Sequence, residues 1–189
     1  GPFKGTTPLY WLSWNSKGRA LLKLWLETDS DSFKRIEPEA LSMPCEVGPF
    51  KGTTPLYWLA WNSEGRALLR LWFEEDIECF KGIVSGAWSK ACEVGPPDKG
   101  TTPLYWLAGN PKGCAFLTLW LETDIESFKS IEPEAWSKAC EEGPDKGTTP
   151  LWWLTKSPEG RGLLKLWLQR DPESFKAISS SSWRKPCEG

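Results

Sequence analysis

Cysteine is the first residue type whose spacing could carry chemistry. Four of the six cysteines recur at one position every 47 or 48 residues, namely Cys45, Cys92, Cys140 and Cys187. A zinc site is not expected, because the chain has no Cys-x-x-Cys pair and no histidine. If the interval reflects stacked repeats, equivalent cysteines lie roughly 10 Å apart, beyond the ~7 Å limit for a disulfide. We therefore predict reduced, packed thiols, no metal and an intracellular, reducing compartment; a secreted protein with cross-unit disulfides is the alternative.

The 25 acidic residues could supply paired carboxylates for acid–base chemistry such as glycoside hydrolysis. They recur with the same period, however, and groups such as Glu74, Glu75 and Asp76 stand at expected helix N-termini, where negative charge stabilises the helix dipole. Without histidine no nucleophile–base pair can be proposed, and no glycine-rich phosphate loop is present. The sequence predicts no enzymatic activity and no cofactor.

Tryptophan is the third such residue type, with fourteen copies that fall into columns. The columns are Trp11, Trp58, Trp106 and Trp153; Trp25, Trp72, Trp120 and Trp167; and Leu41, Trp88, Trp136 and Trp183. Unchanging columns favour a place in the core between repeats. The alternative is an exposed ladder that stacks sugar rings or single-stranded nucleic acid. A net charge of −2 argues against nucleic acid.

One column changes its residue type from repeat to repeat and supplies the candidate binding residues. It contains Trp14, Trp61, Gly109 and Lys156. A core position would not accept all three residue types, so this column is expected to be exposed, and two adjacent exposed indoles predict an anchor for a partner. The competing interpretation is that both indoles lie against the neighbouring helix. A second variable column is interpreted as ordinary surface: Lys17, Glu64, Lys112 and Glu159.

The elements that must position these columns belong to a tandem repeat. Lys-Gly-Thr-Thr-Pro-Leu occurs four times and divides one domain, 1–189, into unit 1 (1–47), unit 2 (48–94), unit 3 (95–142) and unit 4 (143–189). Units 1 and 2 differ at three of 25 positions over 1–25 and 48–72, namely Ser13/Ala60, Lys17/Glu64 and Lys23/Arg70. A fixed period of this length indicates an array whose units bury their apolar faces against one another.

Each unit contains start signals for three or four helices. In unit 1, Thr7-Pro8 fits an N-cap followed by proline at the first helical position, and Asn15 and Asp29 fit two further N-caps. The predicted helices are about 8–14, 16–27 and a bent or split segment over 30–43. A short helix is expected to begin at Pro38, and in unit 3 at Pro133. The apolar residues follow helical spacing and no useful strand pattern is present, so the predicted fold is all-α.

The repeated motifs resemble ankyrin repeats. The family's turn and first helix are matched by Gly52, Thr54, Pro55, Leu56 and Ala60, and its second helix by Gly65, Leu68, Leu69, Leu71 and Trp72. The same positions recur in all four units. The resemblance implies a right-handed solenoid of helix pairs; a HEAT-like solenoid is the structural alternative.

The chain departs from the ankyrin pattern in two ways. Tyr10, Tyr57, Tyr105 and Trp152 replace the histidine after Thr-Pro-Leu, so the family's histidine-centred hydrogen bonds cannot form. Each unit is also roughly 14 residues longer than the 33-residue repeat. These residues are expected to form the third helical segment in place of the family's β-hairpin fingers. Expanded units of this kind resemble those of effector proteins from intracellular bacteria, which implies the host cytoplasm as a location.

The expected function is a non-catalytic protein-interaction module or scaffold. Its concave surface would be lined by the first helices and centred on Trp14 and Trp61. A carbohydrate-binding ladder and a designed or purely structural repeat are the alternatives. The expected partner is a protein, with no nucleic acid and no membrane. Because unit 1 has no polar cap, its outer face is expected to expose leucine or tryptophan, which favours end-to-end self-association.

Overall fold

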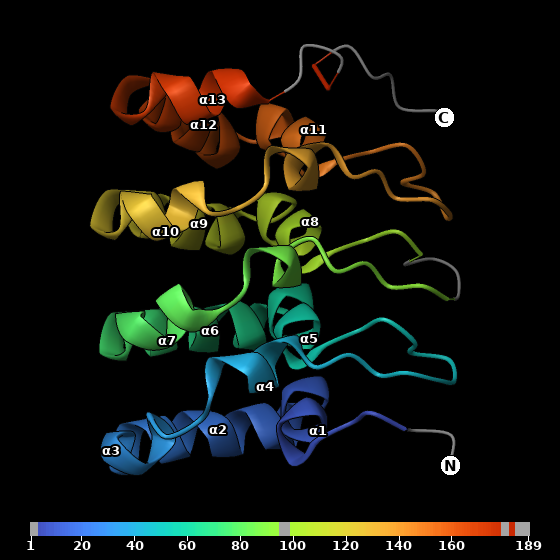
Figure 1. The fold of residues 1–189 in the computed structure, drawn as a ribbon, viewed down its shortest axis with the longest axis vertical. Helices are drawn as coiled ribbons and strands as arrows, with labels where there is room; N and C mark the ends of the chain where they lie inside the picture. Colours follow the sequence, from blue (N-terminus) through green and yellow to red (C-terminus); the bar gives the residue numbers. More distant parts are fainter. Residues whose placement is uncertain (1–3, 95–98, 179–181, 184–189) are drawn as a thin grey trace.

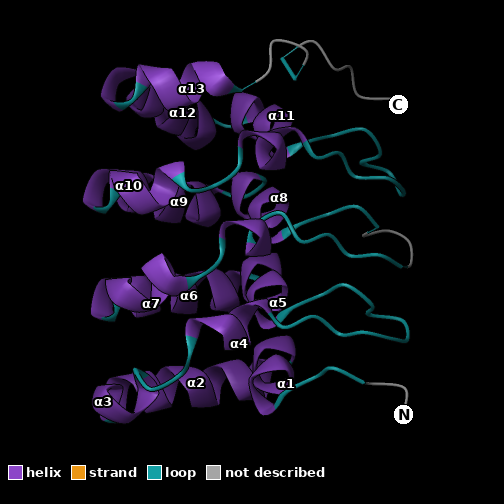
Figure 2. Cartoon of the chain, in the orientation of Figure 1, coloured by secondary structure: helices purple, strands orange, loops and turns teal. Residues whose placement is uncertain are grey.

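The fold consists of four similar helical layers stacked along the long axis of the molecule (Figure 1). The structure is a computed structural model that describes residues 4–94, 99–178 and 182–183. The first helices of the layers are α1 (Pro8–Trp14), α5 (Pro55–Trp61), α8 (Pro103–Ala108) and α11 (Pro150–Lys156). The second helices are α2 (Ser16–Thr28), α6 (Ser63–Glu75), α9 (Pro111–Thr123) and α12 (Pro158–Arg170). All elements in the described residues are helical (Figure 2), so the all-α prediction is confirmed.

The third segment is split into two short helices in the first three layers, and in the fourth the described residues contain its first piece. The first pieces are α3 (Ser30–Phe33), α7 (Ile77–Gly82), α10 (Ile125–Lys129) and α13 (Pro172–Ala177). The second pieces are the α-helix α4 (Pro38–Ser42) and the 3₁₀ helices η1 (Ser85–Ala87) and η2 (Pro133–Ser137). Helices therefore begin at Pro38 and Pro133 as predicted, although the one at Pro133 is a 3₁₀ turn.

The helix starts follow the capping residues in the sequence. The Thr7 side chain accepts a hydrogen bond from the backbone N–H of Tyr10, and Asn15 accepts one from Gly18. Asp29 likewise accepts from the N–H of Ser32 at the start of α3. Equivalent side-chain caps begin the first, second and third helices of the other layers. Each cap satisfies an N–H that the helix itself leaves without a partner.

Extended loops project from the helices on the side opposite α3 (Figure 1). We call these loops the fingers; they are residues 43–54, 89–102 without 95–98, and 138–149. At the base of the first finger, the N–H of Cys45 donates to the carbonyl of Thr53 and the N–H of Gly52 donates to the carbonyl of Cys45, each at 2.9 Å. Gly52 has φ +87°, a conformation that glycine adopts at little cost.

Neighbouring fingers are joined by one backbone hydrogen bond and by one or two ion pairs. Between the second finger and the first, the N–H of Glu93 donates to the carbonyl of Lys51 at 2.9 Å, and the two side chains pair at 2.8 Å. Lys4 with Glu46 and Lys99 with Glu141 repeat the arrangement. Projecting loops are therefore present beside the third helical segment, and in the described residues they contain no β-strand, as expected for a unit without the family's β-hairpins.

Aromatic contacts between layers run through a core that is otherwise rich in leucine. Trp72, Trp88, Trp120 and Trp136 are fully buried. Phe33 of unit 1 contacts Trp72 of unit 2 with ring centroids 4.6 Å apart, and Trp88 of unit 2 contacts Trp120 of unit 3 at 4.7 Å. Within a layer the two helices approach closely at glycine: a Cβ on Gly65 would overlap the carbonyl oxygen of Leu59. A repeated Gly therefore fixes the helix pair and a repeated Trp fixes the stack.

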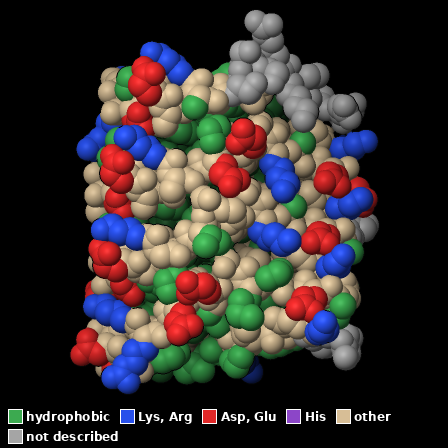
Figure 3. Space-filling model, in the orientation of Figure 1, with side chains coloured by type: hydrophobic (Ala, Val, Ile, Leu, Met, Phe, Trp, Pro, Cys, Tyr) green, Lys and Arg blue, Asp and Glu red, His purple; other side chains and the backbone are tan. Residues whose placement is uncertain are grey.

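The outer side of the third helices is charged. In Figure 3 red and blue side chains alternate along the left-hand edge, over α3, α7, α10 and α13. Ion pairs three residues apart account for part of this pattern, as in Lys81 with Glu78 at 2.6 Å and Lys176 with Glu173 at 3.0 Å. No helix in the described residues is long and apolar enough to cross a membrane.

Candidate functional site

The four predicted site residues all lie at the ends of first helices and are all exposed. Trp14 and Trp61 are the last residues of α1 and α5, and Lys156 is the last residue of α11. Gly109 follows α8, which ends one residue earlier than its counterparts. Trp14 is 38% exposed and Trp61 is 42% exposed. The column is thus at the surface, as its variability indicates.

Trp14 and Trp61 belong to a continuous row of edge-to-face indoles that we call the tryptophan ladder. It consists of Trp11, Trp14, Trp58, Trp61 and Trp106, with successive ring centroids 5.6, 6.5, 5.7 and 6.4 Å apart. The ladder runs from unit 1 through unit 2 into unit 3. Edge-to-face contact leaves one part of each ring packed and another part free, which suits a preformed, rigid surface.

The first finger forms one wall beside the ladder. The Phe50 ring lies 5.9 Å from Trp14 and 5.5 Å from Trp58, measured between ring centroids. Because Phe50 is on a finger and both indoles are on first helices, the ladder occupies the angle between fingers and helices. The two interpretations of Trp14 therefore both apply, since its ring packs against the next unit and still reaches solvent.

The column that was assigned to the core is only partly buried. Trp58 is buried, but Trp11, Trp106 and Trp153 keep part of their surface exposed. The prediction was too strong because the column lies at the edge of the layer junction, beside the fingers. The columns of Trp72 and Trp88 do lie in the core, except that Trp183 is exposed and Trp25 is half-buried.

A column of buried tyrosines next to the ladder forms hydrogen bonds from each unit to the next. The Tyr10 hydroxyl hydrogen-bonds to the Thr53 hydroxyl of unit 2 at 2.7 Å. Tyr57 makes the same bond to Thr101 at 2.9 Å, and Tyr105 to Thr148 at 2.7 Å. Burial raises the pKa of Tyr105 to about 12, against the opposing effect of the Thr148 hydrogen bond. Tyrosine thus supplies an inter-unit hydrogen bond where the ankyrin motif has histidine.

An arginine column fixes the helix ends that carry the exposed residues. Nη1 of Arg19 donates to the carbonyl oxygens of Ser13 at 3.0 Å and Trp14 at 2.7 Å. Arg66 and Arg161 cap α5 and α11 in the same way. In unit 3 the position is Cys114, whose thiol donates to the Ala108 carbonyl at 3.4 Å. The signal in the sequence is an arginine that directly follows the repeated glycine, and our sequence analysis did not use it.

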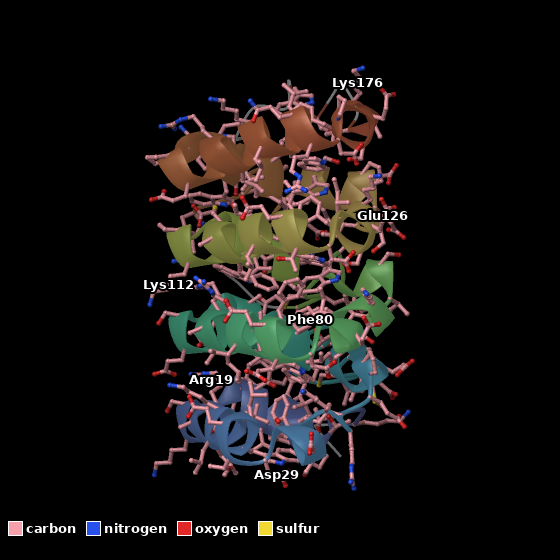
Figure 4. All side chains as sticks on the ribbon, turned by 90° about the vertical axis from the view of Figure 1, so that its left-hand side faces the viewer. Arg19, Asp29, Phe80, Lys112, Glu126 and Lys176 are labelled. Atoms are coloured by element: carbon pink, nitrogen blue, oxygen red, sulfur yellow. The ribbon has the colours of Figure 1, made fainter. Side chains whose placement is uncertain are left out.

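Arg19 also pairs with the column that was interpreted as ordinary surface. Its Nη2 lies 3.0 Å from Oε2 of Glu64, across the junction between units 1 and 2. At the next junction the equivalent residue is Lys112, and the buried Nε of Arg66 has no hydrogen-bond partner in the described residues. Figure 4 shows Arg19 at the boundary of the first two layers and Lys112 at the boundary of the second and third. The column therefore contributes to one junction and not to the next.

Two hollows of the surface lie away from the ladder, between second helices. One of about 290 Å³ separates α2 from α6, and one of about 500 Å³ lies between α9 and α12 with Arg70 of α6 at its edge. Small residues such as Ala20 and Gly162 line these grooves. Their lining mixes basic and acidic side chains and has no arrangement that indicates a reaction.

The described cysteines are buried in the packing: Cys45, Cys79, Cys92, Cys114 and Cys140. Burial raises the pKa of Cys79 to about 12, which makes its thiolate scarce at neutral pH. Cys187 lies outside the described residues. No group of three or more His, Cys, Asp or Glu residues in the described part of the chain could hold a metal ion.

Comparison of the chain with models of protein families, with curated proteins and with solved structures finds no match. The function is therefore inferred from the geometry of the tryptophan ladder and the residues around it.

Proposed function

We propose that the chain is a non-catalytic protein-interaction module built as a right-handed solenoid of four ankyrin-like units. The capped helix pairs and the projecting fingers support the ankyrin-like assignment over a HEAT-like one, because the fingers are a feature of the former architecture. The long, stacked form offers a partner a continuous surface across several units.

The observation that carries the proposal is the tryptophan ladder in the angle between first helices and fingers. Trp14 and Trp61 expose about two fifths of their surface while their edges stay packed. The Arg19 and Arg66 caps hold the carbonyls at the ends of α1 and α5. Large, rigid aromatic side chains of this kind are the usual anchors of protein interfaces. Cys45, Cys79 and Cys114 are free thiols buried in the packing, which supports a reducing compartment for this interaction.

The proposal is tested by selecting peptides from a displayed library on the whole chain and measuring their affinity for variants. Replacing both Trp14 and Trp61 by Ala is expected to weaken the selected peptides at least tenfold with helicity preserved. Lysine at both positions is a second variant, since Lys156 already occupies this column. Val84→Ala is the matched control, because Val84 is also exposed but lies outside the ladder.

Three outcomes would count against the proposal. One is that no peptide is enriched, and another is that the enriched peptides bind the tryptophan variants as tightly as the original chain. The third is that oligosaccharides of glucose bind in a Trp14-dependent manner while peptides do not, which would favour the carbohydrate-binding alternative.

End-to-end self-association stays a separate prediction, supported by the outer face of unit 1. Leu21 and Leu24 there are 53% and 55% exposed, whereas Leu68, the equivalent of Leu21 in unit 2, is 2% exposed. Figure 3 shows hydrophobic side chains gathered along this lower edge. Sedimentation velocity is expected to show concentration-dependent association that Leu21→Lys removes and Val84→Lys does not. A monomer at all concentrations would refute it.

A further inference from the structure

The tryptophan ladder is interrupted at one place, the junction between units 3 and 4. At the two earlier junctions an exposed tryptophan contacts the indole of the next unit, Trp14 on Trp58 and Trp61 on Trp106. At the third junction the next indole is Trp153, but the residue that would contact it is Gly109. Trp153 is partly exposed and Gly109 is exposed.

The geometry at Gly109 matches the places that tryptophan fills in the other units. A Cβ built on Gly109 would lie 3.6 Å from both Cγ and Cδ2 of Trp153, which is ordinary van der Waals contact. A side chain at this position would therefore start against the Trp153 ring, as Trp14 lies against Trp58. In units 1 and 2 the equivalent position carries an indole, Trp14 or Trp61, which indicates the kind of group that fits beside Trp153.

The finger residue beside this place differs in a way that defines the ligand further. At the first junction it is Phe50, whose carbonyl accepts from the N–H of Thr53 at 3.0 Å and from its hydroxyl at 2.7 Å. At the third junction it is Asp145, which accepts the same two bonds from Thr148 at 3.0 and 2.6 Å. The two turns are equivalent, so Asp145 stands at the position of its finger that Phe50 occupies in the first one.

A second observation places Asp145 near this junction. After the larger effect of burial, the charge of Asp145 contributes to raising the pKa of Tyr105, the tyrosine below Trp153. No ion pair involving Asp145 is found in the described residues. An apolar wall thus meets an acceptor that carries a full negative charge.

We propose that the place bounded by Gly109, Trp153 and Asp145 receives a tryptophan or tyrosine side chain from the bound protein. This inference rests on the proposed function and names the chemistry of its partner. The incoming ring packs on Trp153 and completes the ladder, and its N–H or O–H donates to the Asp145 carboxylate. An aliphatic side chain has no such donor.

The test uses N-acetyl-tryptophan amide as the probe and ligand-observed NMR on the whole chain as the measurement. Gly109→Trp fills the place from within and is expected to weaken probe binding at least tenfold. Gly86→Trp is the matched control, because a Cβ on Gly86 meets no atom within 4 Å and the added indole covers nothing. The control is expected to bind the probe like the original chain.

Two more variants test the assigned parts separately. Asp145→Phe restores the residue of the first junction and is expected to remove any preference for the tryptophan probe over N-acetyl-phenylalanine amide. Trp61→Gly opens an equivalent place against Trp106 and is expected to raise the number of bound probe molecules from one to two. Thermal unfolding of each variant shows whether it is folded.

The outcomes separate this inference from the proposed function. Equal probe binding by the original chain and by Gly109→Trp would overturn the inference, as would equal binding of N-acetyl-leucine amide. If displayed peptides depend on Trp14 and Trp61 but bind Gly109→Trp unchanged, the inference fails while the interaction function stands. If the probe binds as expected but no peptide is ever selected, the proposed function fails while the assignment of an aromatic site stands.

Discussion

The junction between units 1 and 2 and the junction between units 3 and 4 share a core and differ at the surface. In the core, Phe33 contacts Trp72 at the first junction, and Phe128 contacts Trp167 at the third with ring centroids 5.2 Å apart. The tyrosine–threonine hydrogen bond is 2.7 Å long at both. What positions one unit on the next is therefore the same at the two ends of the molecule.

The surface residues of the same two junctions have changed together. The first has Trp14, Phe50 and the Arg19–Glu64 ion pair. The third has Gly109 and Asp145 at the first two positions and Cys114 in place of the arginine. This repeat therefore keeps the residues that stack its layers and varies exposed residues such as Trp14, together with the buried residue that caps the first helix, Arg19 or Cys114.

The largest expected effect tests whether the two cores are equivalent. Trp72→Ala and Trp167→Ala each remove a buried indole and are each expected to lower the free energy of unfolding by about 3–5 kcal/mol. Urea unfolding followed by circular dichroism measures the loss. Val84→Ala, at an exposed position, is the control and should stay within about 0.5 kcal/mol of the original chain.

A large difference between the two tryptophan variants would contradict the claim that the first and third junctions have equivalent cores. If Trp167→Ala cost about 1 kcal/mol while Trp72→Ala cost the full amount, unit 4 would be a loosely attached end, and the third junction could not present a rigid site.

A smaller effect is expected from the arginine that closes the first junction. Arg19→Ala leaves the carbonyls of Ser13 and Trp14 without their donor and Glu64 without its partner. Because Arg19 is buried, we expect a loss of about 1–3 kcal/mol in the free energy of unfolding. Arg161→Ala removes the equivalent cap at an exposed position and is expected to cost less. Equal losses would show that burial of the cap is unimportant.

The sequence predicts the helical skeleton of this molecule well, because its signals are local. Thr7-Pro8, Asn15 and Asp29 each begin the helix that their capping chemistry indicates, and their equivalents do so in every layer. The exposure of Trp14 and Trp61 was also predictable, since Gly and Lys occupy the same column. These inferences need only a repeat period and the preferences of single residues.

The parts that the sequence did not reveal depend on contacts between distant residues. Arg19 caps carbonyls five and six positions away and also reaches Glu64, 45 residues away. The role of the arginine column and of the column that contains Glu64 therefore cannot be read from either column alone. The fingers carry no strand pattern, because their order comes from single bonds such as Glu93 to Lys51.

Restoring the missing arginine at the third junction is expected to stabilise the molecule modestly. In Cys114→Arg the new guanidinium would face the Ala108 carbonyl, which Cys114 now contacts, and Glu159, the equivalent of Glu64. We expect a gain of about 0.5–1.5 kcal/mol in the free energy of unfolding. Thermal and urea unfolding measure it. A loss instead would show that the earlier end of α8 has moved its carbonyls away from this position, so that the two junctions differ in backbone as well as in side chains.

The smallest effect concerns the second junction, which is intermediate between the other two. It keeps the arginine, Arg66, but has Lys112 where its partner should be, and the buried Nε of Arg66 has no partner in the described residues. Lys112→Glu supplies a carboxylate and is expected to raise the free energy of unfolding by about 0.2–1 kcal/mol in dilute buffer. The gain should shrink in about 1 M salt, where the Debye length falls to ~3 Å. Lys17→Glu makes the same charge change in unit 1, outside the three junctions between the four units, and should give no gain. If both variants stabilise equally, the effect comes from net charge, and the Arg19–Glu64 pair is then not what distinguishes the first junction.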